Sequence, residues 1–132
     1  MKRKLGINID CLRGQTDSLS TMELARKIGF EAITTAGAYT LEEISALKRK
    51  ADELGMEFPY LHAPYKGINA LWGEDGEAAD MMRQITETID AASACGVPAL
   101  VFHVSSGWNP PPINDVGLTH FDALVDYAEK KG

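Results

Sequence analysis

A unit of strand, helix and glycine recurs along the chain, and this repeat limits the fold more than any other feature. Gly29, Gly55 and Gly96 each follow a stretch of apolar residues with helical spacing, and a short apolar run comes directly after each of them. Glycine ends helices because it adopts the left-handed conformation with little strain. Gly132 has the same relation to the last helical stretch. The alternation predicts parallel βαβ units with right-handed crossovers.

The boundaries of the expected elements follow from periodicity and from capping residues. Capping boxes are predicted at Ser20 and Thr40, each with a glutamate three residues later, and Thr119 is the expected cap of the last helix. Pro64 ends the third strand, because its nitrogen cannot donate to a sheet. The expected strands are 5–10, 30–35, 58–62 and 99–104, and the expected loops that follow the last two are 63–76 and 105–117.

These long loops predict where a site lies. In (β/α)8 barrels the site is built from the strand-to-helix loops at the carboxyl ends of the strands, and a full barrel takes about 250 residues. The 132 residues are about half of that length. The predicted fold class is therefore α/β, a (βα)4 half of a TIM barrel with parallel strands and with helices on the outer face. The predicted domain is a single unit over 1–132.

Two of the expected strands carry a histidine at or beside their carboxyl end. His62 and His103 each occupy a strand end beside a loop, and the carboxyl ends of parallel strands share one edge, so both imidazoles are expected in one site. They are candidate metal ligands, substrate contacts or caps, since neutral imidazole binds zinc and manganese well. Asn8 at the end of the first strand and Trp108 in the last long loop are candidate substrate contacts. His120 is expected to face solvent.

Composition narrows the classes of partner. The net charge is −6, from 13 basic and 19 acidic residues, which makes nucleic-acid binding unfavourable. No apolar stretch reaches the length of a membrane span. The basic start is not followed by the apolar region of a signal peptide, so a cytoplasmic location is expected.

Three segments together resemble a known family. They are His62-Ala63-Pro64-Tyr65, the helix end at 91–97, and Val101-Phe102-His103. They are similar to the xylose isomerase-like TIM-barrel superfamily, which includes sugar and sugar-phosphate isomerases and epimerases, dehydratases and the endonuclease IV group (AP endonuclease family 2). The resemblance covers nearly the whole chain but only the N-terminal half of the family's barrel, its first four βα units.

The resemblance implies a function and a set of site residues. It implies the N-terminal half of a metal-dependent sugar or sugar-phosphate isomerase or epimerase, with His62, His103 and Tyr65 at the substrate. Together with Asn8 and Trp108, which their positions suggest, these are the predicted substrate-binding residues. The resemblance also implies a divalent metal (Mn, Zn, Mg or Co) in the full barrel, with His62 and His103 as metal ligands in the endonuclease branch. The acid–base carboxylates belong to the family's second half, so no catalytic residue is assigned here and this chain alone is expected to be inactive. The metal is expected in the full barrel, and this chain alone can lack it.

Two alternatives are of other classes. The first is a non-catalytic half-barrel, truncated or natural, that self-associates as a homo-oligomer through its open barrel face. The second is an endonuclease IV-like abasic-site nuclease. The segment Val104-Ser105-Ser106-Gly107 departs from the Pro-Gly usual in the nuclease branch, which with the negative charge disfavours that alternative.

Overall fold

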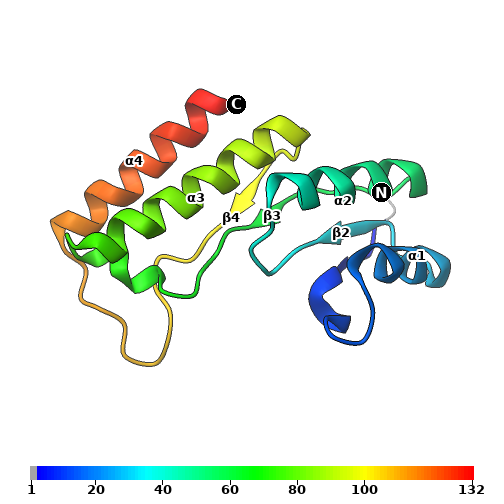
Figure 1. Ribbon diagram of the computed structural model, residues 1–132, viewed down its shortest axis with the longest axis horizontal. Helices are drawn as coiled ribbons and strands as arrows, with labels where there is room; N and C mark the ends of the chain where they lie inside the picture. Colours follow the sequence, from blue (N-terminus) through cyan, green and yellow to red (C-terminus); the bar gives the residue numbers. More distant parts are fainter. Residues whose placement is uncertain (1–2) are drawn as a thin grey trace.

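The computed structural model describes residues 3–132, and in these residues four short strands alternate with longer helices (Figure 1). In Figure 1 the chain continues from β3 (Leu61–His62) and β4 (Leu100–Val101) into the long loops at the lower left of the view. The elements in chain order are β1 (Gly6–Asn8), the 3-10 helix η1 (Ile9–Leu12), α1 (Ser18–Ile28), β2 (Ala32–Thr34), α2 (Leu41–Leu54), β3 (Leu61–His62), the 3-10 helix η2 (Ile68–Trp72), α3 (Gly76–Cys95), β4 (Leu100–Val101) and α4 (Asp115–Lys131).

Local signals define most of the helix ends. The capping box of α2 is present: the Glu43 amide donates to the Thr40 hydroxyl, and the Glu43 carboxylate accepts from the Thr40 amide. Gly29, Gly55 and Gly96 end α1, α2 and α3 in the left-handed conformation. These predictions from sequence are confirmed.

Two predicted caps are wrong. Asp17, not Ser20, caps α1, because its carboxylate accepts from the Ser20 amide at 2.9 Å and the helix starts three residues earlier than predicted. Asn114, not Thr119, caps α4, because its side-chain oxygen accepts from the Gly117 amide at 2.9 Å. In both cases an earlier acceptor satisfies the first free amides of the helix.

The strands pair in parallel in the order of the sequence. β1 pairs with β2, β3 pairs with β4, and an isolated parallel bridge between Ala32 and Glu57 joins the two pairs. In the second pair Leu61 lies opposite Leu100, and His62 lies opposite Val101. This arrangement is the predicted arc of a parallel barrel with helices on its outer side.

The strands are shorter than the sequence predicted. Pro59 lies between the Glu57 bridge and β3, and a proline has no amide hydrogen to donate to a ladder, so the expected strand 58–62 is reduced to its last two residues. β4 ends at Val101, so His103 lies two residues beyond the strand. The end of the first expected strand forms η1 instead, and the loop 63–76 contains η2.

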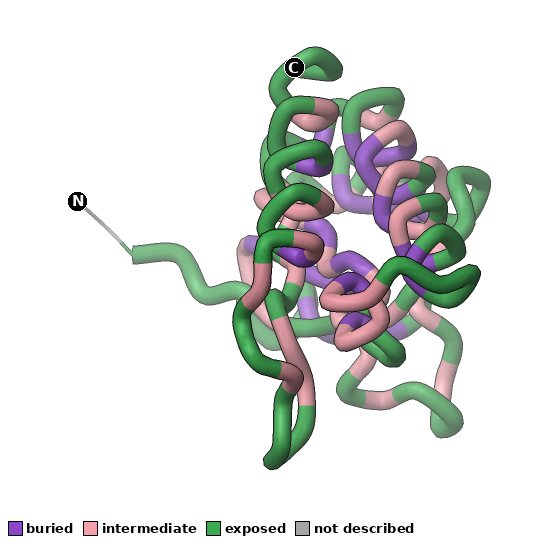
Figure 2. Tube along the Cα trace, turned by 90° about the vertical axis from the view of Figure 1, so that its left-hand side faces the viewer, coloured by how far each residue is buried: buried purple, intermediate pink, exposed green. Residues whose placement is uncertain are grey.

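Alternation along the strands separates a packed face from an uncovered face. Leu61 and Ile33 are fully buried in the core beneath the helices, whereas Val101 is 41% exposed. Because His62 is paired with Val101, both side chains belong to the uncovered face. In Figure 2 the buried residues lie where helices and strands face one another, and the outer turns of the helices are exposed.

No helix within residues 3–132 is long and apolar enough to span a membrane.

Candidate functional site

The two strand-end histidines meet at the carboxyl edge of β3 and β4. The Nε2 atoms of His62 and His103 are 3.2 Å apart, and their ring centroids are 5.1 Å apart. His62 is half-buried at the last position of β3, while His103 is exposed in the loop after β4. The structure therefore brings together the pair that the sequence placed in one site.

Hydrogen bonds determine which ring nitrogen of His62 is free. Its Nδ1 lies 2.7 Å from the carbonyl oxygen of Ala63, and a carbonyl only accepts, so Nδ1 carries the hydrogen. Nε2 of a neutral His62 then has a lone pair directed at His103, whose Nε2–H donates to it. The result is an imidazole that presents an acceptor to the open face of the strands.

Thr35 holds the backbone of His62 in place. The His62 amide donates to the Thr35 hydroxyl at 3.1 Å, at a point where β2 and β3 have no ladder hydrogen bond of their own. Thr35 is 1% exposed, so this contact is shielded from water. The threonine thus positions the histidine although it is far from it in the sequence.

Tyr65 forms a wall beside the pair. Its ring centroid lies 5.1 Å from that of His103 and 5.5 Å from that of His62, and the side chain is 45% exposed. An aromatic face next to two imidazoles offers an apolar surface beside polar nitrogens, a combination that suits a small polar ligand such as a sugar.

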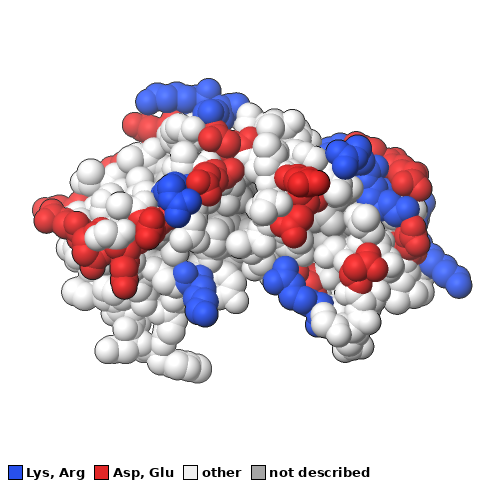
Figure 3. All heavy atoms as spheres, in the orientation of Figure 1, with Lys and Arg blue, Asp and Glu red and all other residues white. Residues whose placement is uncertain are grey.

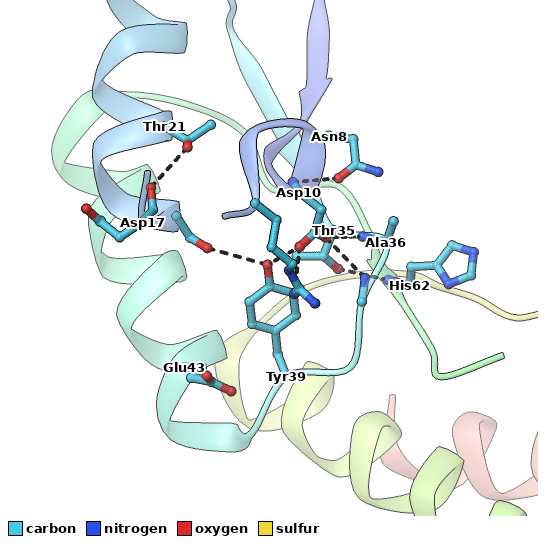
Figure 4. A network of polar contacts seen from close by, with 12 residues as sticks. Asn8, Asp10, Asp17, Thr21, Thr35, Ala36, Tyr39, Glu43 and His62 are labelled. Atoms are coloured by element: carbon cyan, nitrogen blue, oxygen red, sulfur yellow. Dashed lines mark hydrogen bonds and ion pairs between the residues drawn. The ribbon is translucent and has the colours of Figure 1, made fainter. Parts of the chain in front are cut away.

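A polar network centred on Asp10 fixes the neighbouring loop (Figure 4). One carboxylate oxygen accepts from the amides of Ala36 and Gly37 at 2.7 and 3.1 Å. The other accepts from the Tyr39 hydroxyl at 2.6 Å and pairs with the Arg13 guanidinium at 2.7 Å. The network ties the segment after β1 to the loop after β2, which directly follows Thr35.

The same contacts set the ionisation of Asp10 and Tyr39. Partial burial acts to raise the pKa of Asp10, but the hydrogen bonds from Tyr39, Ala36 and Gly37 and the charge of Arg13 outweigh it and hold the pKa below its ordinary value. Burial, followed by the hydrogen bond to Asp10, raises the pKa of Tyr39. At neutral pH the pair is therefore a carboxylate and a neutral phenol.

The two long loops are fastened to each other near the histidines. The Asn69 side chain donates to the Ser106 carbonyl at 2.9 Å and accepts from the Ser106 amide at 2.8 Å. The Trp72 indole donates to the Val104 carbonyl at 2.8 Å. These contacts fix the backbone directly after His103, so the exposed imidazole extends from a constrained segment.

The other predicted site residues are not joined to the histidine pair. The Asn8 side chain accepts from the Asp10 amide at 2.9 Å and caps η1. Trp108 is fully exposed. His120 does not face solvent as expected, because its Nδ1 lies 2.8 Å from the Leu71 carbonyl. The roles of Asn8 and Trp108 in substrate binding stay predictions.

Sequence reasoning did not identify Thr35 and Arg13 as parts of the site. Arg13 follows Asp10 by three residues, just after the first predicted strand. This short spacing between opposite charges was the signal in the sequence that the two side chains pair. Thr35 is the last residue of the second predicted strand, so the sequence already placed it at the carboxyl edge of the sheet. Its partner is 27 residues away, and nothing in the sequence pattern links the two.

The histidine pair fits one part of a metal site. Two nitrogens at about 2.0–2.1 Å from a tetrahedral zinc would lie about 3.3 Å apart, close to the observed 3.2 Å. The hydrogen bond from His62 Nδ1 to a carbonyl is also the support that metal-bound histidines usually have. Within residues 3–132, however, no three His, Cys, Asp or Glu side chains are grouped to hold a metal, so the pair supplies two ligands and not a closed site.

The fold and the site define a class. Parallel strands with outer helices, and a polar cluster at their carboxyl ends, are the features of half a (β/α)8 barrel with its site at the usual face. The family profile of the xylose isomerase-like TIM barrel matches residues 22–132, and the chain belongs to this family.

Solved structures agree with the assignment of the fold. A D-psicose 3-epimerase from Clostridium cellulolyticum H10, determined with D-tagatose, is similar with a TM-score of 0.76 and 17% identity over 98% of this chain and 50% of that one. A xylose isomerase domain protein from Planctomyces limnophilus has a TM-score of 0.68 and 18% identity, over 98% and 49%. A mannonate dehydratase from Streptococcus suis serotype 2 has 0.66 and 16%, over 100% and 52%.

The chain spans about half the length of these solved structures. At such identities the likeness shows the fold alone. A sequence comparison with curated proteins finds no match.

Proposed function

We propose that residues 1–132 form a single (βα)4 unit, the N-terminal half of a metal-dependent sugar or sugar-phosphate isomerase or epimerase. The observation that supports this most is the pair of imidazoles 3.2 Å apart beside Tyr65, at the carboxyl end of the strands. Membership of the xylose isomerase-like family and the sugar-converting enzymes among the similar structures support it as well.

The residues of this chain bind and orient the sugar. The Ala63 carbonyl holds the hydrogen of His62 on Nδ1, so Nε2 accepts a hydrogen bond from a substrate hydroxyl when that hydroxyl takes the place of the His103 N–H. His103 donates or accepts beside it, and the Tyr65 ring packs against the carbon chain. In the endonuclease branch the two histidines would be metal ligands instead.

The remaining chemistry needs groups from the rest of the barrel. A divalent metal (Mn, Zn, Mg or Co), when bound, polarises the substrate oxygens so that the adjacent carbon loses a proton more readily. His62 and His103 would supply two of its ligands at most. The reaction also needs a base beside that carbon, usually a carboxylate. No residue here is assigned to that role, so we expect no turnover from the 132-residue chain alone.

The test uses the parent protein that carries this segment, supplied with manganese and a panel of ketoses and ketose phosphates in deuterated water. Proton abstraction next to the carbonyl incorporates deuterium into the recovered sugar. His62→Ala and His103→Ala are expected to lower turnover by about a hundredfold or more, as loss of well-placed catalytic contacts does. His120→Ala, outside the pair, is the matched control. Unchanged turnover in both test variants would remove the pair from the mechanism.

A second candidate is a half-barrel that self-associates. β1 and β4 each pair with one neighbour in the described residues, and Leu5, Val101 and Val104 are 65, 41 and 57% exposed. Unpaired edges and exposed apolar side chains favour association. We expect a homo-oligomer by light scattering at high concentration, weakened by Val101→Lys and unchanged by Val125→Lys on α4. A monomer at all concentrations would refute it.

An abasic-site nuclease is the lesser alternative, and the net charge of −6 opposes the phosphate contacts that it needs. A cytoplasmic location stays a prediction from the sequence.

A further inference from the structure

A hollow of about 410 Å³ lies next to the histidine pair, between the segment after β1 and the loops after β2 and β3. Its lining includes Arg13, Gly37, Tyr65 and Lys66. Tyr65 belongs to both places, because its ring also contacts the two imidazoles. In Figure 3, basic side chains border the notch at the lower edge of the molecule from both sides.

The Arg13 guanidinium is held in a fixed position at this hollow. Asp10 binds one of its nitrogens at 2.7 Å, and its central carbon lies 5.4 Å from the centre of the Tyr39 ring. Glycine at position 37 leaves room for it, since a β-carbon there would lie 2.7 Å from Nη2. The side chain is nevertheless 60% exposed, so its remaining N–H donors are available to a ligand.

The charge of the hollow is positive. Asp10 is the acidic residue in its lining, and four donors already engage that carboxylate. Lys66 is exposed and forms no ion pair within residues 3–132. Arg13 and Lys66 against Asp10 leave one net positive charge beside the proposed sugar site.

We propose that this hollow binds the anionic end of the substrate, a phosphate or a carboxylate, while the carbon chain passes Tyr65 to reach His62 and His103. Arg13 offers a planar fork that suits either group, and Lys66 offers a mobile point charge. This rests on the proposed function and narrows it, since it makes the substrate a sugar phosphate or a sugar acid in place of a neutral ketose.

The test titrates the 132-residue chain with fructose 6-phosphate, gluconate, fructose and inorganic phosphate, followed by the amide NMR signals of Gly37 and Lys66. We expect saturable shifts with fructose 6-phosphate or gluconate, weaker binding of inorganic phosphate at the same amides, and no shift with fructose at equal concentration. Comparing the first two ligands separates phosphate from carboxylate. Lys66→Gln should weaken binding about fivefold, the order of one exposed ionic contact, and Lys27→Gln on α1 should leave it unchanged.

Three results would overturn the inference: equal shifts with fructose, equal weakening by the two lysine variants, or no response to either anionic sugar. The outcome is separable from that of the proposed function. Anion binding at these amides without any turnover by the parent protein would refute the proposed isomerase function and support the anion site. Turnover of neutral ketoses that Lys66→Gln does not change would support the isomerase function and refute the anion site.

Discussion

Replacing Asp10 by alanine tests the network that supports the candidate site. The carboxylate is 13% exposed and accepts from the amides of Ala36 and Gly37, from the Tyr39 hydroxyl and from Arg13. Alanine leaves two amides and a phenol without their acceptor. A buried donor that loses its partner costs about 1–3 kcal/mol. Because water reaches part of this region, we expect a loss of about 3 kcal/mol in the free energy of unfolding, a large share of the ~5–15 kcal/mol of a typical domain.

The assay is urea unfolding followed by far-ultraviolet circular dichroism, with the slope of the transition as a check on two-state behaviour. Asp10→Asn keeps the shape and one acceptor, so it should lose about half as much and stays measurable if the alanine variant does not fold. Asp126→Ala, at an exposed position of α4, is the matched control. A loss below about 0.5 kcal/mol for Asp10→Ala, comparable to a neutral surface change, would refute the reasoning.

The stability that the Asp10 carboxylate contributes should depend on pH in a defined direction. The folded-state pKa of Asp10 is lower than its unfolded value, so its ionisation stabilises the fold fully above the unfolded pKa of about 3.9. That stability is lost as the pH falls through the folded-state pKa. The difference in unfolding free energy between the wild type and Asp10→Asn should therefore be constant from about pH 5 to 7 and shrink in more acidic solution. A difference that widens on acidification would contradict the assignment.

Two further substitutions are expected to lower the free energy of unfolding. Gly117→Ala would normally strengthen a helix, but its β-carbon would lie 2.0 Å from Cε3 of Trp72, so we expect a loss of about 1–3 kcal/mol by thermal unfolding; a stabilised variant would show that the indole moves freely. Thr35→Val removes the acceptor of the His62 amide inside the protein and should cost about 1–3 kcal/mol and shift the His62 ring signals in NMR; Thr35→Ser should retain both, and equal behaviour of the two variants would exclude the hydrogen bond.

The parts of the fold that the sequence predicted depend on partners close together in the chain. The Thr40–Glu43 capping box spans one helical turn, and the glycines that end the helices act at their own positions. Ser20 failed as a cap because Asp17 offers an acceptor one turn earlier, and sequence alone did not show where the preceding loop enters the helix. The predicted length of the third strand was wrong because Pro59 interrupts the apolar run, so that only Leu61 and His62 form the strand.

For the candidate site, the sequence predicted the histidine pair but not the contacts that support it. His62 and His103 were found because parallel strands align their carboxyl ends, so two strand-end histidines must be neighbours if the strands are. Their supports were not found. The Asp10 carboxylate binds an amide 26 residues away, and Thr35 binds one 27 residues away, which no periodicity reveals. Such contacts appear only when the loops have been placed in space.

The loop after β2 links these two groups of contacts. Thr35 accepts from the His62 amide, and the next two residues, Ala36 and Gly37, donate to Asp10. Three consecutive residues therefore hold the histidine on one side and the carboxylate, with its bound Arg13, on the other. Since every one of these contacts lies within the present chain, the histidine, the arginine and the spacing between them do not depend on residues from the rest of a barrel. Under the proposed function, this chain contributes fixed binding groups, and we expect the reacting base and the remaining metal ligands to come from elsewhere in the protein.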